Sequence, residues 1–265
     1  HYLALTNIFL KKYDVAESYF RTNIDIAEGG YQRQALWFMP SLHIFNSDFD
    51  RAIEATDEYI EKMPSLELSY ILENNQLAGV HFHRFLAFSH NQQDQDSFNE
   101  IEQYAKFRMN VMEYNKSSMT EKQFENGQNW LNYQLVLLNA WHSILFGRYD
   151  DARESLSNAS LFVDERVKEN PDLQYPYFDI NVFEGMIHLN EGDFNASLES
   201  FEKTKGKVGN GALNMDRVYF DYFHALALKG VGRNDEANQT FYRISNENFY
   251  GIGRALTREL ASAQL

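Results

Sequence analysis

Two segments of the chain repeat one pattern of small, bulky and glycine positions. Each segment predicts a first helix that contains a small residue, followed by a short turn and a second helix. The second helix has a small residue three positions after its first residue, and a bulky residue four positions after the small one. The segments are Ala140-x2-Ser143-x3-Gly147-x-Tyr149-x2-Ala152-x3-Leu156 and Ala225-x2-Leu228-x3-Gly232-x-Asn234-x2-Ala237-x3-Phe241. Small residues at fixed positions let two helices approach closely, so the pattern predicts paired antiparallel helices.

The second-helix part of this pattern recurs along most of the chain. Each copy has an aromatic or polar first position, a small residue and then a bulky or β-branched residue, and a polar or glycine turn precedes it. The strong copies are Tyr13/Ala16/Phe20, Phe49/Ala52/Thr56, Tyr149/Ala152/Leu156, Phe194/Ser197/Phe201 and Asn234/Ala237/Phe241, with a weaker one at Phe98/Ile101. Self-similarity at this period is the signature of a repeat protein.

The unit resembles the tetratricopeptide repeat. Gly147-Arg148-Tyr149 and Gly192-Asp193-Phe194 match that family's Gly-x-Tyr turn, and Pro64 and Pro171 match the proline that closes its second helix. The resemblance implies an all-α fold, a right-handed α-solenoid of about six helix–turn–helix repeats with a C-terminal capping helix. The expected repeats lie near residues 1–30, 33–64, 70–115, 130–170, 177–205 and 215–245, with the cap at 246–265.

The spacing between copies departs from the family. Successive copies lie 36 to 51 residues apart, whereas the family period is 34 residues, so we expect longer helices or insertions. We expect one superhelical domain over residues 1–265, as a piece of a longer protein, because the chain opens with His1 inside a repeat. The alternative is an ordinary helical bundle whose turns coincide by accident.

The resemblance also implies a binding surface. In the family the first helix of each pair lines the concave face, and the same positions here form an apolar, aromatic groove with scattered amides. The partner-binding residues expected from this carry-over are Gln34, Trp37, Gln134, Trp141, Asp179, Met186, Tyr219 and Tyr222. Tryptophan and tyrosine concentrate binding energy at protein interfaces. The alternative for each ring is that it packs between helices.

Composition narrows the classes of partner. The 265-residue chain has a formal charge of −14 and no stripe of Lys and Arg, so we expect no nucleic-acid partner. No apolar run is long enough for a transmembrane helix, so we expect no membrane insertion. Cysteine is absent, which excludes disulfides and thiolate chemistry. We expect a soluble protein, cytoplasmic or periplasmic, and the lack of cysteine favours an extracytoplasmic compartment.

Motifs for catalysis and metal binding are weak. His81 and His83 lie two apart, and on a helix such residues point in different directions. Glu184 and His188 share a helix face, but a metal centre needs further ligands that the sequence does not supply. No nucleotide-binding, zinc-protease or nucleophile-elbow motif occurs. The sequence therefore predicts no metal, no cofactor and no catalytic residue.

Three functions remain. The first is a non-catalytic scaffold that binds a protein or peptide along its concave face, as the sensor or interaction part of a larger regulatory protein. The second is a structural subunit that buries its aromatic surface in a homo-oligomer. The third is a helical-toroid glycoside hydrolase, which would use two facing carboxylates.

Overall fold

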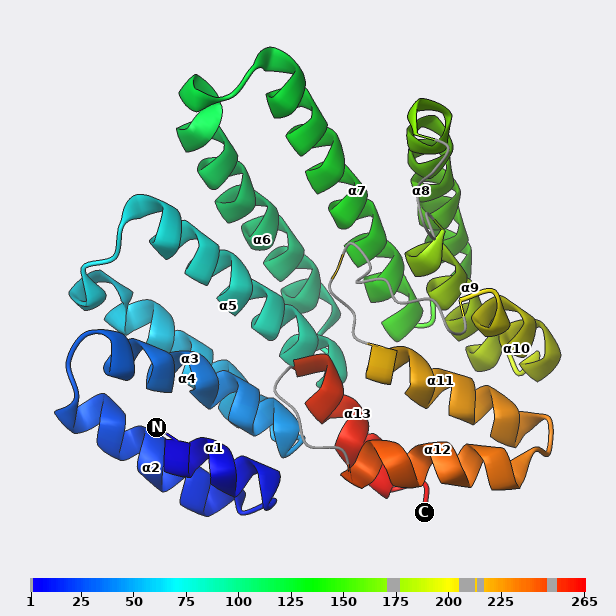
Figure 1. Cartoon of the computed structure of the whole chain (residues 1–265), viewed down its shortest axis with the longest axis horizontal. Helices are drawn as coiled ribbons and strands as arrows, with labels where there is room; N and C mark the ends of the chain where they lie inside the picture. Colours follow the sequence, from blue (N-terminus) through cyan, green and yellow to red (C-terminus); the bar gives the residue numbers. More distant parts are fainter. Residues whose placement is uncertain (1, 171–176, 205–212, 214–216, 247–251) are drawn as a thin grey trace. The chain divides into compact units, whose positions relative to one another are not determined.

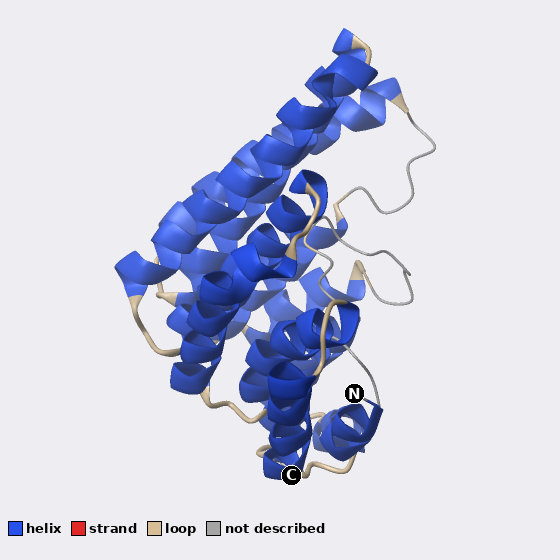
Figure 2. Ribbon diagram, turned by 90° about the vertical axis from the view of Figure 1, so that its left-hand side faces the viewer, coloured by secondary structure: helices blue, strands red, loops and turns tan. Residues whose placement is uncertain are grey.

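A computed structural model describes residues 2–170, 177–204, 213, 217–246 and 252–265 of the chain, with the side chains of 217–219 and 252–256 excepted. Within these ranges every regular element is helical, as Figure 2 shows. The expected all-α class is therefore confirmed for the described residues. The chain divides into two compact units, His1–Gln128 with Asn248–Leu256, and Asn129–Glu247 with Thr257–Leu265.

The first unit holds three helix pairs. Neighbouring helices along the chain pack against one another, and Figure 1 shows the members of each pair running antiparallel. Its helices are α1 (Tyr2–Phe9), α2 (Tyr13–Ile26), α3 (Gly30–Phe45), α4 (Phe49–Lys62), α5 (Tyr70–His90) and α6 (Asp94–Asn115), with short 3-10 helices η1 (Met63–Leu66) and η2 (Lys116–Ser118). The long helix α7 (Glu121–Leu145) begins in this unit and ends in the second.

The second unit holds the remaining pairs. Its helices after α7 are α8 (Tyr149–Glu169), α9 (Phe178–Asn190), α10 (Phe194–Glu202), α11 (Arg217–Gly230) and α12 (Asn234–Asn246). The last helix, α13 (Ile252–Ser262), contributes its C-terminal part to this unit. There Thr257 and Ala261 are buried, and the Lys229 ammonium of α11 donates a hydrogen bond of 3.1 Å to the Gln264 side chain. The predicted cap residue Phe249 lies outside the described residues.

Six described turns join paired helices with the same geometry. The residue two positions before each second helix has a positive φ of 55° to 82°. The amide of the next residue donates to the carbonyl five positions earlier, at 2.8–2.9 Å. This bond and the left-handed residue together form a Schellman motif, which ends one helix and redirects the chain into the next. The left-handed residues are Lys11, Ser47, Gln92, Gly147, Gly192 and Gly232.

The second helices bury the small and bulky positions of the repeated pattern. The small residue is 0% exposed in each of the six, and the bulky residue four positions later is at most 4% exposed. The small positions are Ala16, Ala52, Ser97, Ala152, Ser197 and Ala237. A side chain no larger than alanine or serine lets the partner helix approach closely at this point.

One copy of the pattern was placed in the wrong register. The sequence pairs Phe98 with Ile101, but Phe98 is 39% exposed, whereas Ser97 is 0% exposed and hydrogen-bonds to Ser89 on α5 at 2.6 Å. The third hairpin therefore begins its second helix at Asp94, with Ser97 as the small residue and Ile101 as the bulky one. The aromatic residue Phe98 lies directly after the small position Ser97 and favours an alignment that begins four residues too far along the helix.

Candidate functional site

Ion pairs join α2 and α4, the second helices of the first two hairpins. In the first unit Glu17 of α2 pairs with Arg51 of α4, and Arg21 of α2 pairs with Glu58 of α4. Residues 51, 55 and 58 share one face of α4, and Ala55 is buried between the two charged residues. Long side chains thus bridge the space between the two helices.

At the matching positions of α8 and α10 short side chains replace the two arginines, whereas Arg153 and Lys203 stand where α2 and α4 have Glu17 and Glu58. Counted from the first residue of each helix, Arg21 corresponds to Ser157, Arg51 to Ala196 and Ala55 to Ser200. Serine and alanine cannot span the distance that arginine spans. The ion pairs that bridge α2 and α4 therefore have no counterpart between α8 and α10 among the described residues, where Arg153 and Lys203 pair within their own surroundings.

The second unit holds a pocket of about 470 Å³. Helices α8, α9 and α10, which Figure 1 labels, all contribute residues to it. The residues that line it are Arg153, Leu156, Ser157, Ser160, Glu184, Ile187, His188, Ala196, Glu199, Ser200 and Lys203. Leu156 and Ile187 are buried and give it an apolar floor, while three serine hydroxyls and five ionisable groups surround that floor. Its volume falls in the range of small-ligand sites, about 300–1,000 Å³.

The cationic side chains of the pocket have carboxylate partners. Arg153 donates to Glu191 at 2.5 Å and lies 3.6 Å from Asp150. The hydrogen bond from the guanidinium to Glu191, which favours the charged form, raises the pKa of Arg153. The Lys203 ammonium lies 3.7 Å from Glu199.

Two other polar groups of the pocket have no partner within the described part of the chain. Glu184 on α9 is half-buried and makes no hydrogen bond or ion pair there. Ser200 on α10 is 4% exposed and its hydroxyl likewise has no described protein partner. His188, one helix turn after Glu184, has its Nδ1 atom 4.0 Å from Glu191 instead. Both groups line the pocket and can hydrogen-bond to water or to a ligand there.

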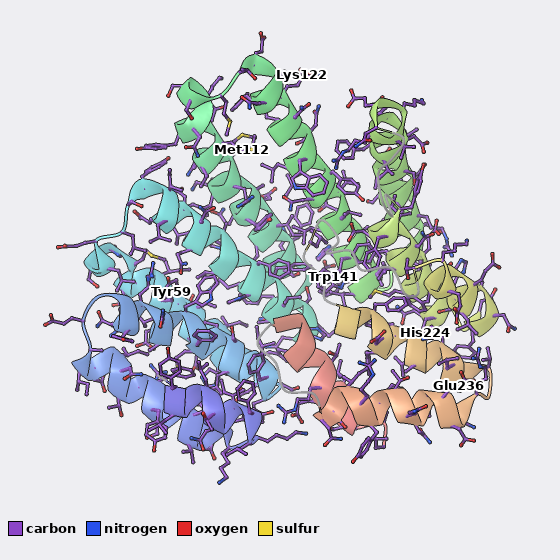
Figure 3. All side chains as sticks on the ribbon, viewed as in Figure 1. Tyr59, Met112, Lys122, Trp141, His224 and Glu236 are labelled. Atoms are coloured by element: carbon purple, nitrogen blue, oxygen red, sulfur yellow. The ribbon has the colours of Figure 1, made fainter. Side chains whose placement is uncertain are left out.

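Most of the residues predicted to line a concave binding face are buried in the structure. Five of them, Gln134, Trp141, Asp179, Met186 and Tyr222, are 8% exposed or less. Trp141, labelled in Figure 3, has its ring 6.2 Å from that of Phe183. Side chains buried to this degree pack within the protein and have little surface left for a partner.

The other predicted positions differ among themselves. Gln34 is exposed on α3, and Trp37 is half-buried with its ring 6.0 Å from that of Tyr59. The side chain of Tyr219 lies outside the described residues. None of the seven predicted residues whose side chains the structure describes lines the pocket between α8 and α10. The signal that could have found this pocket is the replacement of long charged residues by serine and alanine at equivalent positions of two second helices.

The two histidines of the His81-x-His83 motif point to different surroundings. His81 shares a hydrogen bond of 2.5 Å with Glu100 of α6, which also accepts from Arg84 at 2.8 Å. Burial raises the pKa of Glu100, but the bonds from His81 and Arg84 outweigh it and leave the pKa below its ordinary value. His83 is buried against Trp37, 5.0 Å between ring centroids. No group of three or more candidate metal ligands occurs in the described residues.

Comparisons with protein-family models, with curated proteins and with solved structures find no match. Among the described helices, none combines the length and the apolar character needed to cross a membrane.

Proposed function

We propose that this chain is a non-catalytic scaffold that binds a segment of another protein. Its hairpins would stack as a right-handed solenoid of tetratricopeptide type, which presents a long surface to a partner. Support comes from the six equivalent turns and from the small buried residue that every described second helix carries at the same position.

The pocket between α8, α9 and α10 is the proposed binding site, and it is the observation on which this function depends. It is a concave surface with the volume of a small-ligand site, an apolar floor and mostly polar side chains around that floor. The buried aromatic residues of the predicted groove would instead hold the hairpins together. A partner side chain entering the pocket would bury apolar surface and satisfy the unpaired polar groups.

A peptide-display selection against the whole chain tests this function. Ser157 is exposed at the pocket, so Ser157→Trp fills the opening without disturbing the core. Asn158→Trp puts the same ring on the same helix outside the pocket and serves as the control. We expect selected peptides to bind the unmodified chain and the Asn158 variant, and to bind the Ser157 variant at least tenfold more weakly. Selection of no peptide, or equal binding to both variants, contradicts the proposal.

Self-association is a second candidate, favoured by the first hairpin. Val15 and Tyr19 occupy the positions of α2 that correspond to Arg51 and Ala55 on α4, which face the preceding second helix. Together with Tyr2, Leu3 and Leu10 they are 39–80% exposed. Sedimentation at several concentrations tests this candidate: a dimer that Tyr19→Lys abolishes supports it, and a monomer at all concentrations excludes it.

A further inference from the structure

One carboxylate of the pocket between α8, α9 and α10 has no cationic partner among the described residues. Arg153 is matched by Glu191 and Asp150, and Lys203 by Glu199. Glu184 then stands without a cation in the described part of the unit, beside the buried side chain of Ile187. A carboxylate next to apolar side chains loses solvation, and an approaching cation restores that loss.

Hydroxyl oxygens lie around the same pocket. Ser200 is almost fully buried and Ser157 is exposed, and neither hydroxyl has a hydrogen-bond partner among the described residues. Ser160 donates its proton to the Leu156 carbonyl at 2.9 Å, so its oxygen can still accept. A primary ammonium group carries three N–H donors, which one carboxylate and two hydroxyl oxygens can satisfy.

The apolar floor fits the chain that carries such a group. Leu156, Ile187 and Ala196 offer methyl groups for contact with a run of methylenes, as the stems of long cationic side chains require. The cations of the pocket lie toward solvent, since the side chains of Arg153 and Lys203 are 43% and 50% exposed. Paired and solvated in this way, they oppose a ligand ammonium only weakly. The net charge of −14 favours the approach of a cation.

We infer that this pocket binds a primary alkylammonium group, recognised by Glu184 and the hydroxyls of Ser157 and Ser200. The inference rests on the proposed function, in which the group belongs to a lysine side chain of the bound peptide. A free alkylamine offers the same chemistry, and the experiment separates the two sources.

Titration calorimetry of the whole chain with four small probes tests the inference. The probes are a blocked Ala-Lys-Ala tripeptide, the same tripeptide with the lysine acetylated on its side chain, the same with norleucine, and n-butylamine. We expect the lysine tripeptide to bind at least tenfold more tightly than the acetylated and norleucine forms, because both of these lack the positive charge. Equal binding of the three tripeptides, or no binding of any amine at millimolar concentration, overturns the inference.

Variants assign the recognition to Glu184. Glu184→Gln keeps the shape of the side chain and removes its charge, and we expect it to weaken binding of the lysine tripeptide about tenfold. Glu154→Gln, an exposed position of α8 outside the pocket, is the matched control and is expected to bind like the unmodified chain. Unchanged binding by the Glu184 variant overturns the inference.

The outcomes also separate this inference from the proposed function. Binding of butylamine as tight as that of the lysine tripeptide, and lost in Glu184→Gln, supports the ammonium site and contradicts a peptide ligand. Display-selected peptides that lack lysine and still lose binding in Ser157→Trp support the scaffold and overturn the ammonium site.

Discussion

At the scale of single residues, the left-handed position of the turn between paired helices is a glycine in some hairpins and another residue in others. Gly147, Gly192 and Gly232 adopt the left-handed conformation without steric cost, because they lack a Cβ atom. Lys11, Ser47 and Gln92 adopt the same conformation with a Cβ atom and carry a strain of about 1 kcal/mol each. The first three hairpins therefore keep the motif at a cost that the last three do not have.

Substitutions in the turns reveal this cost. Nothing lies within 4 Å of a Cβ atom placed on Gly192, so Gly192→Ala introduces backbone strain alone. We expect it to lower the free energy of unfolding by about 1 kcal/mol, and Gln92→Gly to raise it by about 0.5 kcal/mol. Urea denaturation measures both. A stabilising Gly192→Ala substitution would mean that the turn differs from the Schellman geometry.

Buried histidines make stability depend on pH. Burial lowers the pKa of His83 to about 3 and that of His90 to about 4. In the unfolded chain each histidine takes up a proton near pH 6.5, whereas in the folded chain it does so only at the lower value. The unfolded state then binds more protons, so stability present above pH 6.5 is lost as the pH falls toward about 4. The loss is at most about 1.4 kcal/mol per pH unit for each group.

His90→Phe isolates one of these groups. The imidazole stacks on Phe49 at 4.9 Å between ring centroids, and its Nε2 atom has no partner among the described residues. Phenylalanine keeps the ring contact and removes the titration. We expect the variant to lose less stability than the unmodified chain between pH 6.5 and 4.5. Equal slopes in denaturation curves across this range would show that His90 becomes protonated in the folded state.

At the scale of helices and hairpins, the sequence predicted most of the elements. Small residues such as Ala152 and turn glycines such as Gly192 are local signals, because each acts on its own helix or turn. The hairpin of α5 and α6 lacks both an aromatic first residue and a turn glycine, so the sequence predicts the wrong register for it, and the structure shows that Gln92 forms the turn and Ser97 is the small residue. A repeat is hard to align from sequence where a residue other than glycine, such as Gln92, adopts the left-handed conformation of the turn.

The pocket could not be predicted in the same way. It arises from Ser157, Ala196 and Ser200, residues that are common on any helix. Their significance appears only when the hairpins are compared in space and Arg21 and Arg51 are seen to fill the matching region of another pair. The unpaired state of Glu184 is likewise a property of three helices together. Patterns along the chain do not contain this information.

Charged residues also join helices within the first unit. Arg84 of α5 bonds to Glu100 of α6, to Thr56 at 3.1 Å and to Asp57 of α4, and its guanidinium lies 5.1 Å from the ring centroid of Phe88. Glu100→Gln leaves the guanidinium partly buried and without its main counter-charge. We expect a loss of about 2 kcal/mol in the free energy of unfolding.

Glu102→Gln provides the control for this change. Glu102 lies two residues further along α6 and is exposed, so its neutralisation should shift stability by less than about 0.5 kcal/mol. Denaturant titration of the two variants side by side makes the comparison. Equal stabilities would show that Asp57 alone satisfies Arg84.

At the scale of the whole molecule, we expect unfolding to spread from one hairpin to the hairpin next to it in the chain. Most of the described contacts join helices that are adjacent in sequence, so a local defect should spread to the next hairpin and weaken with distance. Because the chain divides into two compact units, we expect such a defect to stay within the unit in which it arises.

Two equivalent phenylalanines test this expectation. Phe20 of α2 and Phe201 of α10 are the bulky residues at the same position of their helices, and both are fully buried. Replacing either by alanine removes about 3–5 kcal/mol of packing. We expect Phe201→Ala to accelerate amide hydrogen exchange a hundredfold or more in α9 and α10, with little change in α1 and α2, and Phe20→Ala to do the reverse. Mass spectrometry of exchange resolves these segments. A uniform acceleration along the chain in both variants would mean that the two units unfold together.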